Sequence, residues 1–219
     1  HVLPFASFVR FSHQENAYLN SSVNSLDEVA SQIEGNQLLT MYPGDVWTGE
    51  DHTSEASAIA LAKYRRDWAD IEKQPLKSHQ PVTMEKILDA ANQRIKDMQE
   101  KYHRWALRRV PEVSFYVTDL HRAFAVNLSK GAREVDLSES DCVVSLGAQA
   151  AWHAFAMRFG LPTLGVSARY RINRSEPAFA MLKKLGSAYS SGFYTRKAPR
   201  FGMGPRLWEF WWRRRRDVV

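Results

Sequence analysis

Apolar and polar residues follow three different patterns along the chain, and the first covers residues 1–52. An apolar run over residues 2–11 predicts a strand, and a shorter run over residues 38–42 predicts another. Between them, Ser25 is placed to cap a helix that Gly35 ends. The order of strand, helix and strand is typical of an α/β fold.

Residues 53–110 have the period of amphipathic helices instead. A first helix is expected to begin after Thr53 and to end in the segment 74–81, which contains two prolines. A longer helix is expected after Thr83, because apolar positions recur at spacings of three and four until Pro111. Together these helices form a predicted helical bridge.

After Pro111 the pattern predicts an α+β domain with an antiparallel sheet. The predicted strands are 113–117, 123–127, 135–137, 141–146 and 164–171, and the predicted helices are 148–159, closed by Gly160, and 177–185. The chain is therefore expected to have three parts, with bounds 1–52, 53–110 and 111–219.

The composition is that of a folded globular protein, because 44% of the residues are hydrophobic and 25% are charged. The longest apolar runs, 143–146 and 150–156, are far shorter than the roughly 20 residues of a membrane span. Cys142 is the only cysteine, which excludes an internal disulfide and a zinc site of several thiolates. A single thiol suits a reducing cytosol, so we expect a cytoplasmic protein.

The formal charge of +6 is concentrated in the C-terminal tail, and the rest of the chain is nearly balanced, which argues against nucleic-acid binding. The tail residues that would contact an anionic surface are Trp211, Trp212, Arg213, Arg214, Arg215 and Arg216. Aromatic and basic residues in this order suit peripheral contact with an anionic membrane. The alternative is an amphipathic terminal helix that packs on the domain with its arginines in solvent.

The segments Pro4-Phe5-Ala6-Ser7-Phe8 and Tyr42-Pro43-Gly44-Asp45, with Asn20 between them, resemble the end of a metallo-β-lactamase-fold domain. The branch that they resemble contains the CMP-N-acetylneuraminate hydroxylases and related metal-dependent hydrolases. In that branch such segments close an αββα sandwich, which implies that residues 1–52 are the C-terminal segment of a lactamase-like domain. Because the chain opens at His1 inside a strand pattern, we expect it to be the back part of a larger protein.

The resemblance implies a divalent metal, zinc or iron, in the complete protein. Such hydrolases bind the metal with an H-x-H-x-D-H loop. The seven histidines of this chain are scattered, and no pair of them has the HxH or HExxH spacing. We therefore expect no metal, no cofactor and no catalytic residue in this chain.

The resemblance also implies that residues on or just after the first strand line the substrate mouth of the metal site. The candidates are His1, Ser7, His13, Asn16 and Asn20. The alternative is that Asn16 and Asn20 satisfy loop backbone groups and that His13 is a surface residue.

The segments 117–120, 141–145 and 159–169 resemble the sterol-carrier-like α+β module that some of these hydrolases carry at the C-terminus. Such a module would use Trp152, Phe155 and Phe159 to wall an apolar pocket for a lipid or a partner helix. The alternative is that these three side chains are ordinary core.

A serine and a histidine also occur close together, at Ser145 and His153, with Gln149 one helical turn before the histidine. No G-x-S-x-G elbow is present, and Asp141 is not placed as an orienting acid. Nucleophilic catalysis is therefore not expected there.

Two hypotheses about function remain open. The first is the C-terminal portion of a metal-dependent hydrolase, which supports the catalytic domain and shapes its substrate mouth but is not catalytically complete alone. Its partners would be the missing N-terminal part of the same protein and a small-molecule substrate. The alternative is a binding module for an apolar ligand or an anionic membrane surface.

Overall fold

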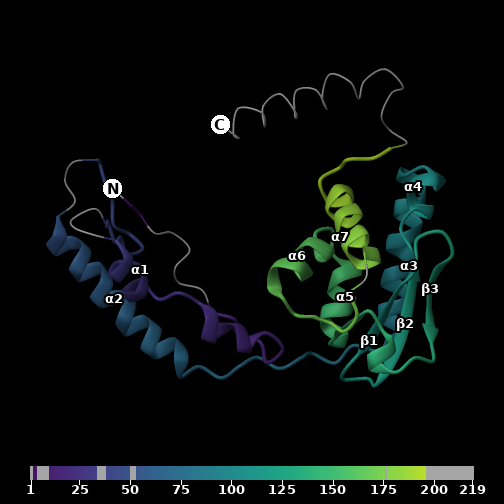
Figure 1. Cartoon of the computed structure of the whole chain (residues 1–219), viewed down its shortest axis with the longest axis horizontal. Coiled ribbons are helices and arrows are strands. Elements are labelled where there is room, and N and C mark those ends of the chain that lie inside the picture. Colours follow the sequence, from purple (N-terminus) through teal and green to yellow (C-terminus); the bar gives the residue numbers. More distant parts are fainter. Residues whose placement is uncertain (1, 4–9, 34–37, 50–52, 176, 196–219) are drawn as a thin grey trace, which may run out of the picture. The chain divides into compact units, whose positions relative to one another are not determined.

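The computed structural model describes residues 2–3, 10–33, 38–49, 53–175 and 177–195. The chain divides into two compact units, which we call the N-terminal unit (1–78) and the C-terminal unit (79–219). Figure 1 shows their helices and strands. The predicted helical bridge is divided between the units, because α2 (Ser54–Glu72) belongs to the first and α3 (Met84–Lys101) to the second.

The N-terminal unit contains a 3₁₀ helix (Ala17–Ser22), α1 (Leu26–Gln32) and α2. The predicted cap is confirmed: the Ser25 hydroxyl accepts from the Glu28 amide, and the Glu28 carboxylate accepts from the Ser25 amide. The strand predicted at 38–42 is wrong, because only Leu38 forms a bridge, with Val2. Residues 4–9 of the other predicted strand and the predicted stop at Gly35 lie outside the described residues.

Polar contacts hold the N-terminal unit together. Arg65 forms an ion pair with Asp27 and so joins α2 to α1. The Arg10 guanidinium donates to the carbonyls of Ile71 and Gln74 at the C-terminal end of α2, where unpaired carbonyls favour a cation. Within the described residues of this unit, the buried apolar side chains are those of Leu26, Leu39 and Ala60.

The C-terminal unit contains a five-stranded sheet with the order β3-β2-β1-β4-β5. Its strands are β1 (Val113–Val117), β2 (Arg122–Asn127), β3 (Gly131–Val135), β4 (Val144–Leu146) and β5 (Arg171–Ile172). The antiparallel pairs β1–β2 and β2–β3 agree with the prediction. The sheet is nevertheless mixed, because β4 runs parallel to β1. The prediction of a purely antiparallel sheet is therefore wrong.

The segment predicted as a strand over 164–171 is mostly helical. Helix α5 (Ala148–Ala156) ends early, and Gly160 begins a further helix, α6 (Gly160–Ser167), instead of closing the previous one. The two buried leucines of α6, Leu161 and Leu164, lie three residues apart, which is a helical spacing. Short apolar runs fit either period, and burial of this face decides for the helix.

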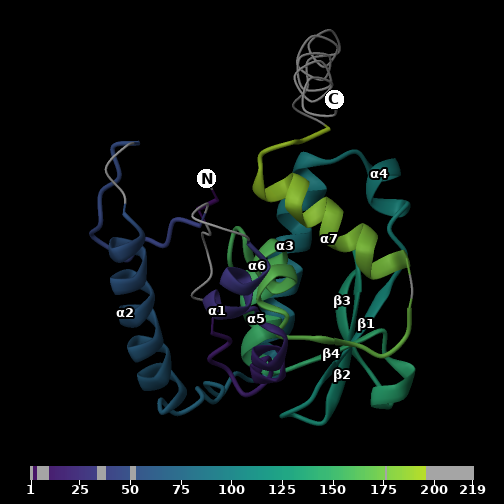
Figure 2. The same ribbon diagram turned by 60° about the vertical axis from the view of Figure 1, so that its left-hand side comes forward.

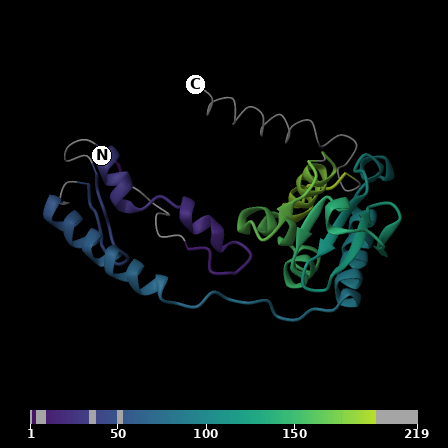
Figure 3. The ribbon, with the colours of Figure 1, turned by 60° about the horizontal axis from the view of Figure 1, so that its bottom comes forward.

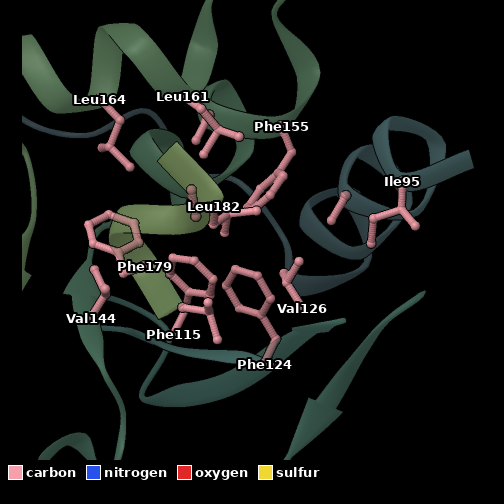
Figure 4. Packing of buried hydrophobic residues seen from close by; sticks show 14 of the residues in the cluster. Ile95, Phe115, Phe124, Val126, Val144, Phe155, Leu161, Leu164, Phe179 and Leu182 are labelled. Atoms are coloured by element: carbon pink, nitrogen blue, oxygen red, sulfur yellow. The ribbon is translucent and has the colours of Figure 1, made fainter. Parts of the chain in front are cut away.

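Helices cover the face of the sheet that carries the core. Helix α3 contacts β2 and β3, and α7 (Pro177–Ser190) contacts β1 (Figures 2 and 3). The core centres on Phe115, whose ring stacks on that of Phe124 with 5.0 Å between centroids. The rings of Phe155 and Phe179 meet it edge-on at 5.9 and 6.0 Å (Figure 4).

The predicted long helix breaks at Tyr102, and α4 (Arg104–Arg108) follows it. Tyr102 is buried, and its hydroxyl donates to the Phe193 carbonyl at 2.6 Å. Burial, with the neighbouring phenols of Tyr194 and Tyr189, raises the pKa of Tyr102 to about 12. The neutral phenol is thus the form that the fold stabilises.

We expect alkali to destabilise the C-terminal unit through this phenol. Because the folded-state pKa lies above that of an unfolded tyrosine, the stabilisation is complete below about pH 10 and is lost as the pH rises toward 12. By pH 12 the free energy of unfolding should fall by about 2 kcal/mol more in the wild type than in Tyr102→Phe. Urea unfolding at a series of pH values measures this difference, and parallel curves for the two proteins would contradict it.

Candidate functional site

The loop between residues 10 and 24 carries the described candidates for a substrate mouth. The Asn20 side chain pairs with the backbone of Phe11: Oδ1 accepts from the Phe11 amide at 2.8 Å, and Nδ2 donates to the Phe11 carbonyl at 3.0 Å. A side-chain amide can take the place of a neighbouring strand in this way because it offers one donor side and one acceptor side. Asn20 thereby fixes the path of the chain into the loop.

Asn16 and His13 lie in the same loop. Asn16 is 4% exposed, and its Oδ1 accepts from the His13 amide at 3.2 Å. On the other side of His13, the Lys77 amide donates to the Ser12 carbonyl at 2.7 Å, and the Gln14 amide donates to the Lys77 carbonyl at 3.2 Å. The structure therefore brings His13, Asn16 and Asn20 into one ordered loop, with both asparagine amides bonded to backbone. His1 and Ser7 lie outside the described residues.

The structure separates the three residues proposed for an apolar pocket. Phe155 is buried in the core between Phe115 and Phe124, and Trp152 is half-buried against the same core. Phe159 follows the end of α5, is 53% exposed and lies under the Arg158 guanidinium, 5.4 Å from its ring centroid.

A small cavity lies beside α5, and none of the three lines it. Its walls include Met98, Met157, Leu161 and Tyr189, and its volume is about 10 Å³, which is room for roughly one water molecule. By contrast, two apolar side chains at α6, those of Phe159 and Val166, are 53% and 84% exposed.

The serine and histidine near α5 have separate partners. The Ser145 hydroxyl is buried and accepts from Asn173 Nδ2 at 2.6 Å. Gln149 Oε1 accepts from the Arg169 guanidinium at 3.1 Å. Burial, and next the charge of Arg169, lower the pKa of His153. Among the described residues, Ser145 and His153 form no hydrogen bond with each other, so the histidine is not placed to act as a base for this serine.

The described residues offer no ligand set for the divalent metal that the family resemblance implies, since no three His, Cys, Asp or Glu side chains among them converge. Burial also raises the pKa of the Cys142 thiol, which disfavours the thiolate that a metal needs. The tail candidates Trp211 to Arg216 lie outside the described part of the chain. Among the helices that the structure describes, none has the length and apolar character needed to cross a membrane.

One hollow on the surface was not indicated by the sequence. It lies between α3, α4 and the turn that joins β2 to β3, and its volume is about 460 Å³. Six of its seven lining residues come from positions 96–108, and Ser129 comes from the turn that packs on α3, so the hollow needs a contact that the sequence does not show. No protein-family model, curated protein or solved structure matches this chain.

Proposed function

We propose that this chain is the C-terminal portion of a cytoplasmic metal-dependent hydrolase of the metallo-β-lactamase fold. In this proposal the N-terminal unit completes the catalytic domain, and the C-terminal unit is an accessory module that supports it. The observation that supports the proposal is how few apolar side chains the described residues of the N-terminal unit bury. Leu26, Leu39 and Ala60 are the apolar side chains that its described residues bury.

Three such side chains are too few to stabilise the described residues of this unit by themselves. Each fully buried leucine contributes roughly 2 kcal/mol, whereas ordering each residue opposes folding by about 1–2 kcal/mol. The ion pair of Arg65 with Asp27 adds little, because both side chains are at least half exposed. Meanwhile Val46 and Ile59 are 81% and 52% exposed. A neighbouring layer, such as the rest of a sandwich, would bury these side chains.

The loop of His13, Asn16 and Asn20 is then the part of this chain that shapes the substrate mouth. Its backbone is held by the two asparagine side chains, so its exposed groups would be presented in a fixed arrangement. Its substrate would be a small molecule. The zinc or iron would be held by residues of the remaining part, because this chain supplies no ligand set among its described residues.

Hydrogen exchange of this chain tests the proposal. Amides of α1 and α2 should exchange with little protection, while those of β1, β2 and α3 should be protected nearly to the level of global unfolding. In a protein that continues upstream of His1, protection of α1 and α2 should rise. An N-terminal unit that unfolds cooperatively and slowly on its own would count against the proposal.

Metal titration gives a second prediction. We expect this chain to bind neither zinc nor iron(II) stoichiometrically and to show no hydrolase activity with either metal, because its histidines are dispersed and its thiol is buried. Calorimetry and an assay with a generic ester substrate would detect both. Tight binding of one metal per chain with turnover would overturn the assignment of the metal site to another part.

A binding module is the second candidate function, and the two exposed apolar side chains at α6 favour it. Phe159 and Val166 would contact an apolar ligand or the membrane interior, and the Trp and Arg residues of the tail would contact anionic headgroups. Such contact would depend on salt. Salt-dependent binding to anionic vesicles that Val166→Asp abolishes would support it, and binding that is unaffected by Val166→Asp would count against it.

A further inference from the structure

The hollow between α3, α4 and the β2–β3 turn, which we call the α3–α4 hollow, has mostly polar and cationic walls. Its lining includes Lys96, Gln99, Glu100, Arg104, Arg108 and Ser129. Leu107, which is 2% exposed, also contributes to it. Three cationic side chains therefore face one space together with a single carboxylate.

Within the described part of the chain, these cations have no acidic partner. Elsewhere in the unit, Arg122 pairs with Glu134 and Arg133 pairs with Glu112. Among the residues that the structure describes, no carboxylate forms an ion pair with Lys96, Arg104 or Arg108. Unpaired cations around a concave surface raise the local concentration of anions.

The walls of the α3–α4 hollow are fixed by hydrogen bonds. The Gln99 side chain donates to the carbonyls of Leu128 and Ser129 at 2.9 and 3.4 Å, which holds the β2–β3 turn against α3. On α4, Arg104 and Arg108 are four residues apart and so lie on the same side of the helix. Two guanidinium groups from α4 and a lysine from α3 thus line one hollow, whose third wall is the β2–β3 turn.

The charge of the whole unit reinforces this arrangement. Residues 79–195 contain 16 Lys and Arg residues against 11 Asp and Glu residues, whereas residues 1–78 contain 6 against 11. The net charge of residues 1–195 is therefore near zero because the basic C-terminal unit and the acidic N-terminal unit offset each other. An anion would be attracted to the C-terminal unit even without the tail.

We propose that the α3–α4 hollow binds a phosphate group, with Arg104, Arg108 and Lys96 as its ligands. Arginine forks bind phosphate oxygens in pairs, and a lysine adds a compact charge, so the three together suit a dianionic phosphomonoester better than a single carboxylate. The Ser129 hydroxyl is a further donor, and the Glu100 carboxylate can accept from a hydroxyl group next to the phosphate. This site does not depend on the lactamase-like interpretation of the N-terminal unit.

The phosphate could belong to a soluble molecule or to a lipid headgroup. Next to the hollow, Trp105 is 56% exposed, and the Arg109 guanidinium lies 5.1 Å from its ring centroid. An exposed tryptophan beside basic residues suits the interface of an anionic membrane, while the hollow itself is large enough for a small phosphorylated molecule. The experiment therefore has one arm for each source.

In the soluble arm, the full chain is titrated with inorganic phosphate and with pyrophosphate, and the amide signals of Ser129 and Lys130 are followed by NMR. In the membrane arm, phosphatidylcholine vesicles with and without phosphatidic acid are compared. Binding in at least one arm should weaken about tenfold or more in Arg104→Gln/Arg108→Gln, because two charge-assisted contacts are removed. Lys96→Gln should weaken the same binding by a smaller factor.

The matched control is Arg171→Gln/Lys184→Gln, which removes the same charge from exposed positions outside the hollow. It should change the affinity by less than about twofold. Loss in the soluble arm alone would assign a soluble phosphorylated ligand, and loss in the membrane arm alone would assign a headgroup. The proposal is overturned if neither arm depends on Arg104 and Arg108, if the control weakens binding equally, or if vesicle binding is lost only on replacement of Arg213 to Arg216.

Discussion

Phe115→Ala should lower the free energy of unfolding of the C-terminal unit by about 4 kcal/mol. Phe115 is fully buried at the centre of the sheet, and its ring contacts those of Phe124, Phe155 and Phe179 (Figure 4). Truncation removes the buried ring and leaves a cavity whose walls come from a strand and two helices. Because these elements also pack on each other, the cavity cannot close fully.

The matched control is Phe159→Ala, the same substitution at a side chain that is 53% exposed. We expect it to change stability by less than about 1 kcal/mol, since little surface is uncovered. Urea unfolding followed by far-ultraviolet circular dichroism compares the two variants. Equal losses would mean that Phe115 is not the centre of the core.

Local signals predicted where α1, α2 and α3 begin. Ser25 was predicted to cap its helix, and helices were predicted to begin after Thr53 and Thr83. Each of the three hydroxyls accepts from a backbone amide of the first helical turn. Such caps depend on residues three positions apart, so sequence suffices to find them. The alternation at Val113, Phe115 and Val117 likewise predicted β1 and its buried face.

The failures concern information that only tertiary contacts supply. Nothing within residues 141–146 shows that β4 lies beside β1 and parallel to it, because that pairing joins segments about 29 residues apart. The apolar run of α6 fits both periods, and packing of Leu161 on α7 decides between them. At 38–42 the apolar run predicted a strand, whereas the structure has a single bridge there, between Leu38 and Val2.

For the candidate site, too, the sequence indicated local hydrogen bonds but not the contacts that the fold creates. Sequence analysis could place Asn16 and Asn20 in a loop and propose that they satisfy its backbone, and the hydrogen bonds to His13 and Phe11 are of that kind. It could not find the α3–α4 hollow, because Ser129 meets α3 only through the fold. Sequence analysis also counted the charge of the chain outside the tail as one near-neutral sum, although the N-terminal unit is acidic and the C-terminal unit is basic.

Gly160→Ala should destabilise the C-terminal unit by roughly 3 kcal/mol or more. A methyl group at Gly160 would collide with the carbonyl oxygen of His153 and would lie 2.5 and 2.8 Å from the carbonyl oxygen and carbon of Ala154. All three atoms belong to the backbone of α5, so no side chain can turn aside to make room. Relief requires α6 to move away from α5, which would also disturb the packing of Leu161 and Leu164 in the core.

Gly165→Ala makes the identical change five residues later in α6, where no atom lies within 4 Å of the added methyl group. Because alanine favours the helix over glycine by up to about 1 kcal/mol, this variant should be as stable as the wild type or more stable. The two thermal midpoints should therefore move in opposite directions. If Gly160→Ala unfolds at the wild-type temperature, the close approach of α5 and α6 is wrong. If both variants are destabilised alike, α6 does not form a helix through Gly165, and the apolar run would have to be read as the strand that its sequence first suggested.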